Sequence, residues 1–145
     1  EGLAAARLTG GRLARRSIRG VTILDDTYNA NPDSVVAALS TLAALHRTGR
    51  RIAVLGRMGE LGKHADEGYQ RVGQRAAATV DSLITVGPET AVLTRSARTA
   101  GLRDVHEAAD TEEAAGILRS LAQEGDIVLV KGSRTARMER VIENF

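Results

Sequence analysis

Short apolar runs alternate along the chain with longer segments in which apolar residues recur at helical spacing. The short runs, rich in Val, Ile and Leu, occupy residues 21–25, 51–55, 82–86 and 126–130, with a weaker one at 103–106. Continuous apolar runs of this length are typical of strands that are covered on both faces, as in a parallel sheet. A further edge strand is expected around residues 13–17.

The longer segments are predicted helices. Residues 32–45 carry apolar side chains near the helical period, with Asp33 or Ser34 in the first turn. Further helices are predicted at residues 65–79, 89–100, 111–123 and 135–144. Because strand and helix alternate throughout, the pattern predicts an α/β fold with a doubly wound, mostly parallel sheet. A glycine-containing N-terminal linker is expected at residues 1–11, followed by one domain at residues 12–145.

Composition narrows the class of protein. A chain of 145 residues with 43% hydrophobic and 26% charged residues is typical of one globular domain with its own core. The net charge is +2 and the charges are mixed, which argues against a nucleic-acid partner. The absence of Cys excludes a disulfide scaffold, a cysteine-based zinc site and a cysteine nucleophile. The absence of Cys also fits the cytoplasm, which is the expected location. No apolar stretch approaches the ~20 residues of a membrane helix, so no membrane partner is expected.

The start of the chain is locally basic. Five arginines there face a single acidic residue, Glu1; they are Arg7, Arg12, Arg15, Arg16 and Arg19. We expect this segment to be a solvated linker or a surface that contacts another domain.

Polar residues gather in three loops that follow predicted strands, where ligands bind in open α/β sheets. In the first loop Asp26 can accept hydrogen bonds from ribose hydroxyls, and Tyr28, Asn29 and Asn31 offer donors, acceptors and a stacking face. A simpler interpretation is that residues 31–34 turn the chain and cap a helix. That interpretation leaves the polar residues before position 31 unexplained, which favours a functional loop.

The second loop, residues 56–64, is rich in glycine. It nearly matches a phosphate-binding P-loop, but five residues separate Gly56 from Gly62 and His64 stands where Ser or Thr would hold magnesium. The glycines imply either a positive φ or a close backbone approach. A bent connection and a ligand-facing loop remain equally compatible with this pattern, and His64 is expected to be a surface residue.

The third loop contains Lys131, Gly132, Ser133 and Arg134 before a predicted helix. Such a sequence is a natural receptor for a carboxylate or a phosphate. Arg134 and Arg137 are expected in the first helical turn, where positive charge opposes the helix dipole and favours an anionic partner. Solvated arginines with Ser133 as a cap are the alternative. We expect all three loops to meet at one rim of the sheet, with Asn29, Glu60 and Ser133 close together.

Together the three loops resemble the Mur ligases over about residues 12–145, and most closely the members that attach D-alanyl-D-alanine. The resemblance is carried by residues 25–34 (DDTYNANPDS), 51–62 (RIAVLGRMGELG) and 128–134 (VLVKGSR), followed by Met138 and Glu139. The family usually has an acidic residue where Arg57 stands, and no role is assigned to that position.

The resemblance implies a Rossmann-like C-terminal domain of a three-domain, ATP-dependent amide ligase. Such an enzyme adds D-alanyl-D-alanine to UDP-MurNAc-tripeptide in peptidoglycan synthesis through an acyl phosphate. The implied ATP-binding residues are Asp26, Asn29 and Asn31. The implied substrate-binding residues are Tyr28, Lys131, Ser133 and Arg134. Magnesium, most of the ATP and the catalytic residues would belong to a central domain of the same chain, so no catalytic or metal-binding residue is expected here and the isolated domain is expected to be inactive.

Other functions stay open. A signalling receiver domain would also show paired acids, here Asp25 and Asp26, and a lysine after its last strand, here Lys131; however, Arg57 and Met58 stand where it needs an aspartate to phosphorylate. A free-standing nucleotide-binding module would bind ATP without further domains. Another Mur enzyme or a folylpolyglutamate-type ligase is also possible, although residues 28–32 (YNANP) argue against it.

Overall fold

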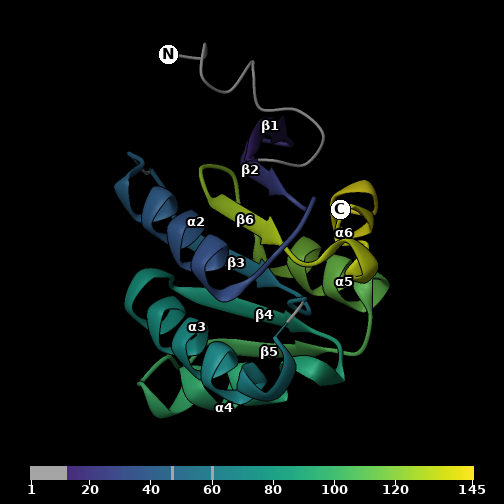
Figure 1. The fold of residues 1–145 in the computed structure, drawn as a ribbon. Coiled ribbons are helices and arrows are strands. Elements are labelled where there is room, and N and C mark those ends of the chain that lie inside the picture. The colour runs from purple at the N-terminus through teal and green to yellow at the C-terminus, as the bar shows by residue number, and fades with distance from the viewer. Residues whose placement is uncertain (1–12, 47, 60) are drawn as a thin grey trace.

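One mixed sheet with helices on both faces makes up the fold (Figure 1). The computed structural model describes residues 13–46, 48–59 and 61–145. The predicted linker at residues 1–11, together with Arg12 and Glu60, lies outside the described residues. The elements are β1 (Ala14–Ile18), β2 (Val21–Asp26), α2 (Pro32–Ala44), β3 (Arg51–Leu55), α3 (Ala65–Thr79), β4 (Ser82–Val86), α4 (Ala91–Thr99), β5 (Val105–Ala108), α5 (Thr111–Leu121), β6 (Ile127–Lys131) and α6 (Glu139–Glu143), with short 3₁₀ turns η1 (Gly62–His64), η2 (Pro88–Thr90) and η3 (Arg134–Ala136).

The strand order across the sheet is β1-β2-β6-β3-β4-β5. Among the described strands, only β1 runs antiparallel to its neighbour, and β6, the last of them in the sequence, pairs with both β2 and β3. The predicted α/β class with a mostly parallel sheet is therefore confirmed. Within the described ranges, no helix combines the length and apolar character needed to cross a bilayer.

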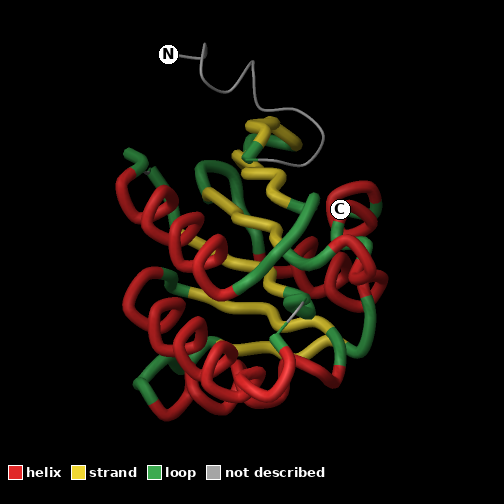
Figure 2. The backbone as a smooth tube through the Cα atoms, in the orientation of Figure 1, coloured by secondary structure: helices red, strands yellow, loops and turns green. Residues whose placement is uncertain are grey.

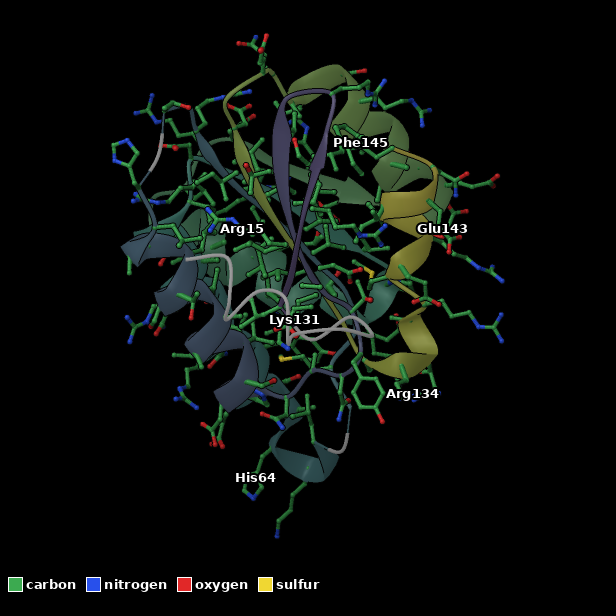
Figure 3. The ribbon with its side chains drawn as sticks, turned by 90° about the horizontal axis from the view of Figure 1, so that it is seen from above. Arg15, His64, Lys131, Arg134, Glu143 and Phe145 are labelled. Atoms are coloured by element: carbon green, nitrogen blue, oxygen red, sulfur yellow. The ribbon has the colours of Figure 1, made fainter. Side chains whose placement is uncertain are left out.

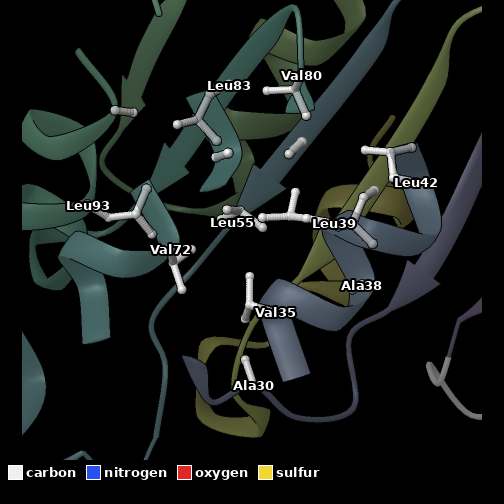
Figure 4. Close-up of a cluster of buried hydrophobic side chains, with 14 of the residues drawn as sticks. Ala30, Val35, Ala38, Leu39, Leu42, Leu55, Val72, Val80, Leu83 and Leu93 are labelled. Carbon is white, nitrogen blue, oxygen red and sulfur yellow. The ribbon is translucent and has the colours of Figure 1, made fainter. Parts of the chain in front are cut away.

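Two buried clusters of side chains lie on the two faces of the sheet. The tube drawing shows the helices that cover these faces (Figure 2). Helices α2, α3 and α4 pack on one face, where Leu39, Val72 and Leu93 surround strand residues such as Leu55 (Figure 4). Helices α5 and α6 pack on the other face through residues such as Leu118 and Val141. Because both faces are covered, the central strands are apolar at nearly every position, which explains the continuous apolar runs in the sequence.

The connections leave the sheet in two directions. The chain passes from β2, β3 and β4 to helices on the first face, and from β5 and β6 to helices on the second face. Adjacent strands whose connections diverge open a crevice at their carboxyl ends, which is where ligands bind in folds of this class. Here such crevices lie on both sides of β6 and between β4 and β5.

Most predicted elements lie within one or two residues of the observed ones, but the helix predicted at residues 135–144 is wrong as a single element. The chain forms η3 and α6, which are separated by Arg137 in a left-handed conformation (φ 53°). Arg137 therefore does not lie in a first helical turn. The break allows Met138 to pack, fully buried, against the backbone at Gly56 and Gly132.

Smaller shifts occur around α4. The helix predicted at residues 89–100 begins as η2, with Pro88 in its first turn, and becomes α-helical only at Ala91. The strand predicted at 103–106 pairs two residues later, because Leu83 pairs with Val105 in the parallel register. The edge strand β1 forms one residue later than predicted and pairs antiparallel with β2.

Candidate functional site

A buried ion pair joins the ends of two neighbouring strands. The parallel register places Asp26 of β2 opposite Lys131 of β6. The ammonium of Lys131 donates to Oδ2 of Asp26 at 2.8 Å and to the carbonyl oxygen of Asn29, also at 2.8 Å. The Lys131 and Asp26 side chains are only 4% and 12% exposed. Lys131 therefore fixes the first loop against β6, and its predicted contact with a substrate carboxylate stays a prediction.

The three predicted loops meet at the carboxyl end of β6. The amide of Gly59 in the second loop donates to the carbonyl oxygen of Ala30 in the first at 3.0 Å. The amide of Ser133 in the third loop donates to the carbonyl oxygen of Arg57 in the second at 2.7 Å. With the Lys131 contact to Asn29, every pair of loops is joined by a hydrogen bond. The expected common rim is present for Asn29 and Ser133.

The first loop is ordered by its own polar side chains. Oδ1 of Asn31 accepts from the amide of Ser34 at 2.9 Å, and the Ser34 hydroxyl accepts from the amide of Asn31, which together form a capping box on α2. Oδ1 of Asn29 accepts from the amide of Ala30 at 2.8 Å. The helix-capping interpretation of residues 31–34 is thus confirmed, whereas the ATP contacts expected of Asn29 and Asn31 stay predictions.

Asp25, which precedes this loop, is buried between two donors. Its carboxylate accepts from a guanidinium NH₂ of Arg16 at 2.9 Å and from the hydroxyl of Thr27 at 2.8 Å. The Arg16 contact gives one of the basic residues near the start of the chain a defined partner. It also anchors the edge strand β1 to β2 beside the loop.

Close packing explains Gly56 of the second loop and Gly132 of the third, whereas Gly62 has a positive φ (57°). A side chain carbon on Gly56 would lie 2.6 Å from the sulfur of Met138, and one on Gly132 would lie 2.5 Å from its Cγ. The amide of Met58 donates to the hydroxyl of Tyr69 on α3 at 3.0 Å. Burial raises the pKa of Tyr69 above its ordinary value, because the buried site disfavours the charged phenolate. Met138 and Tyr69 therefore support the bend of the second loop, and a ligand-facing role for this loop stays a prediction.

An exposed aromatic ring and an arginine form the solvent side of the site. The Arg134 guanidinium lies 4.9 Å from the centre of the Tyr28 ring. Both residues line a hollow of about 680 Å³, together with Asp25, Thr27, Arg137 and Glu139. Seen from above, Lys131 lies near the middle of the molecule and Arg134 toward one side of it, whereas His64 lies at the periphery (Figure 3). This agrees with the surface position expected for His64.

Ser133 lies below the surface between the loops. It is 4% exposed, and its hydroxyl oxygen is 3.1 Å from that of Thr135. The Thr135 hydroxyl also accepts from Arg57 at 2.5 Å. Ser133 and Thr135 thereby connect the second loop to η3. The expectation that Ser133 contacts a substrate stays a prediction.

The side chains at the rim are suited to bind and orient a ligand. Across the described ranges, no group of three or more His, Asp or Glu residues is placed to hold a metal ion. The groups at the rim are instead an aromatic face, amide groups and guanidinium groups, all at the ends of parallel strands. Such groups suit a ligand that carries a base and an anion.

Sequence reasoning did not identify two residues of this region. Tyr69 supports the second loop from α3, and its signal was a lone tyrosine on the apolar face of a predicted helix, in a chain with two tyrosines. The second residue is Arg140, which lies near Arg137; the sequence predicts Arg137 beside an anion, but Arg137 lies outside the helical turn that was expected. Arg137 and Arg140 line the rim because the chain reverses at Arg137, which no local pattern indicates.

Comparison with known proteins identifies a family. Residues 11–134 match the family described as Mur ligase, glutamate ligase domain. The UDP-N-acetylmuramoyl-tripeptide–D-alanyl-D-alanine ligase of Escherichia coli is 35% identical over 97% of this chain and 30% of its own length. The enzyme of the same name from Mycobacterium tuberculosis is 37% identical over 86% of this chain and 28% of its own length. The solved structure of MurF ligase from Thermotoga maritima in complex with ADP matches 94% of this chain and 30% of its own, with a TM-score of 0.81 and 33% identity. The chain thus spans about 30% of the length of these relatives.

Proposed function

Since this chain belongs to the Mur ligase family, we propose that it is the C-terminal domain of an ATP-dependent amide ligase that adds D-alanyl-D-alanine to UDP-MurNAc-tripeptide. The reaction would build the peptidoglycan precursor in the cytoplasm. The carboxylate of the tripeptide is first converted to an acyl phosphate, and the amine of the dipeptide then displaces phosphate to form the amide. The relatives that carry the name of this reaction support the choice of substrates.

The observation that carries the proposal is the meeting of three loops at the crevices beside β6. Amide ligation requires that an amine be oriented against a reactive acyl group, and it requires fixed positive charge near phosphoryl oxygens more than a nucleophilic side chain. The rim provides a fixed frame that can orient a ligand, and it provides exposed positive charge. Arg134 and Arg137 are exposed cations, and the Lys131–Asp26 pair holds the loops in a fixed relation.

The residues of the first hollow fit a nucleotide. The exposed ring of Tyr28 with Arg134 beside it is a stacking platform for a base, and the amides of Asn29 and Asn31 lie next to it in the first loop. Asp26 would accept from the ribose, with Lys131 holding its carboxylate in place. ATP supplies the phosphoryl group that activates the tripeptide carboxylate. Ser133 and Lys131 would order the third loop on the substrate side.

The remaining parts of the reaction are assigned to other domains. We propose that a central domain of the same chain holds most of the ATP and the magnesium ion, and that a further domain holds the UDP-linked peptide. This division agrees with the 28–30% share of the relatives that the chain spans. The isolated domain would then bind and orient but not catalyse.

The alternative functions are less well supported. In a receiver domain the paired acids and the lysine would surround a phosphorylated aspartate. Here Lys131 is committed to Asp26, and Arg57 and Met58 stand after β3, where the aspartate would be needed. Both relatives quoted above carry the D-alanyl-D-alanine ligase name, which favours this reaction over that of another Mur enzyme or a folylpolyglutamate-type ligase.

The proposal is tested in the full-length ligase by following ADP release. Release should require both D-alanyl-D-alanine and UDP-MurNAc-tripeptide, with one amide formed per ADP. Tyr28→Ala should raise the KM for ATP about tenfold, because base stacking on an aromatic ring contributes ~1–3 kcal/mol. Tyr28→Phe keeps the ring and should retain the wild-type KM, as should the peripheral control His64→Ala. ADP release that does not depend on the dipeptide would contradict the proposal.

A further inference from the structure

The side chain of Arg57 lies next to the candidate nucleotide site without being part of it. Arg57 follows β3 and lines a second hollow, of about 360 Å³, at the carboxyl ends of β4 and β5. Among the described residues that line the first hollow, Thr135 is present and Arg57 is not. Because Thr135 lines both hollows, the contact between Arg57 and Thr135 joins one hollow to the other.

Arg57 holds the third loop at two points. Its carbonyl oxygen accepts from the amide of Ser133 at 2.7 Å, and its Nη1 donates to the hydroxyl oxygen of Thr135 at 2.5 Å. The hydroxyl oxygens of Ser133 and Thr135 lie 3.1 Å apart. The three residues therefore form a closed ring of hydrogen bonds, to which the guanidinium of Arg57 contributes the positive charge.

The charge of Arg57 sets the direction of the hydrogen bonds in this ring. A guanidinium group has donors and no acceptor, so the oxygen of Thr135 must accept from it. The Thr135 proton is then available to the hydroxyl oxygen of Ser133. A charged donor strengthens the bond that it makes, and polarisation carries part of that gain to the next bond along the chain. Loss of the guanidinium should therefore loosen Thr135 and Ser133 together.

The element that Arg57 holds in this way is η3, a single turn that carries Arg134. In the part of the chain that the structure describes, every side-chain hydrogen bond of η3 belongs to Thr135. A 3₁₀ turn has poor hydrogen-bond geometry, so a turn of three residues depends on contacts with other segments. The Arg134 guanidinium lies 4.9 Å from the centre of the Tyr28 ring. That position requires η3 to stay in place, and it therefore depends on the Thr135 contact.

We infer that Arg57 is a positioning residue for the nucleotide: through Thr135 it holds η3, so that Arg134 stays over the Tyr28 ring in the first hollow. The inference rests on the proposed function, in which Tyr28 and Arg134 form the platform for the base. An arginine that only covers the surface would leave nucleotide binding unchanged. An arginine that binds a ligand in the second hollow directly would act without Thr135. Variants separate these roles.

The kinetics of the full-length ligase test the inference. Arg57→Met removes the donor and Thr135→Val removes the acceptor, so each should raise the KM for ATP about threefold, the loss expected for one hydrogen bond. The double variant should be no worse than either single variant, because both changes break the same contact. Thr135→Ser keeps the hydroxyl and should retain the wild-type KM. The matched control is Arg103→Met, an exposed arginine that precedes β5 at the opposite end of that strand, and it should behave as the wild type.

Nuclear magnetic resonance of the 145-residue chain provides a readout that does not need the reaction. The side-chain protons of Arg134 lie over the Tyr28 ring, so the ring current should shift their resonances upfield in the wild type. This shift should shrink in Arg57→Met and in Thr135→Val, whereas Thr135→Ser should retain it. The Tm of these variants should stay within about 2 °C of the wild type, because the changed side chains are exposed.

Three results would overturn the inference. An unchanged KM for ATP in Arg57→Met would remove Arg57 from nucleotide binding, and single effects that multiply to about ninefold in the double variant would show two independent contacts. An unchanged shift of the Arg134 protons would show that η3 does not depend on Arg57. Failure of the proposed function has a different appearance, because the wild-type ligase would then form no amide from D-alanyl-D-alanine, while the changes in the Arg134 resonances would remain.

Discussion

At the scale of single residues, buried polar side chains fix the position of the loops that carry the exposed residues of the site. Asp26 and Lys131 neutralise each other between strands, and Tyr69 supports the second loop through one hydrogen bond. Removing one partner of a buried ion pair is strongly destabilising, so Lys131 variants would lose stability as well as function. The exposed groups Tyr28, Arg134 and Arg137 can be changed with less effect on the fold, which makes them better probes of binding.

Tyr69→Phe should destabilise the domain, because the amide of Met58 would lose its acceptor inside the protein. An unsatisfied buried N–H costs about 1–3 kcal/mol. Urea unfolding of the 145-residue chain at neutral pH measures the loss. Tyr28→Phe is the matched control, since that side chain is exposed, and its effect should be within about 0.5 kcal/mol of zero.

The pH dependence of the free energy of unfolding, compared between the wild type and Tyr69→Phe, provides a second check of the burial of Tyr69. The folded pKa of Tyr69 is raised above 10.0, the ordinary value, so the unfolded chain releases the proton first as the pH rises. The wild type therefore loses stability as the pH passes 10.0, whereas the Phe variant has no phenol to ionise at this position. The difference in the free energy of unfolding between the wild type and Tyr69→Phe should narrow above that pH. A constant difference would show that Tyr69 is not buried as described.

At the scale of elements, helix α2 begins at the site, and its N-cap residue, Asn31, is one of the residues predicted to bind ATP. Asn31→Ala removes the acceptor for the amide of Ser34, which should cost about 1 kcal/mol and lower the Tm by roughly 2–4 °C. Asn31→Asp keeps an acceptor at the same position and should retain the stability. If Asn31 also contacts ATP, the Asp variant in the full-length ligase should be stable yet show a raised KM for ATP. A wild-type KM would leave Asn31 with the capping role alone.

The elements also show how far local pattern determines structure. The bounds of β3, β4 and α3 agree with the apolar pattern, because central strands are covered on both faces and α3 has a clear apolar stripe. The helix predicted at residues 135–144 is interrupted because Met138 must reach Gly56, a contact between residues far apart in the sequence. Likewise, the burial of Lys131 depends on β6 lying between β2 and β3. Neither fact can be obtained from residues that are neighbours in the chain.

At the scale of the whole molecule, the candidate site is a rim and not an enclosed pocket. Both hollows are formed by loops from one edge of the sheet, so a ligand here keeps one side available for another domain. This agrees with a reaction in which two substrates on different domains are brought together. It also implies that binding by the isolated domain is weak, because only part of each ligand is contacted.

The isolated chain should therefore bind ATP with a Kd of about 1 mM or weaker, compared with much tighter binding by the full-length ligase. Isothermal titration of the 145-residue chain measures the value, with the full-length ligase titrated under the same conditions as the positive control. Submicromolar binding by the isolated chain would favour a free-standing nucleotide-binding module instead.

The position of β6 has a consequence for how the protein is made. During translation the chain emerges from the ribosome with β2 and β3 already present but without the strand that lies between them. Until β6 is synthesised, two partial sheets each carry an unpaired edge, and such edges readily pair with other chains. The strand between β2 and β3 is thus added only after the other five strands have been made, so the partly made sheet is exposed to aggregation until β6 emerges.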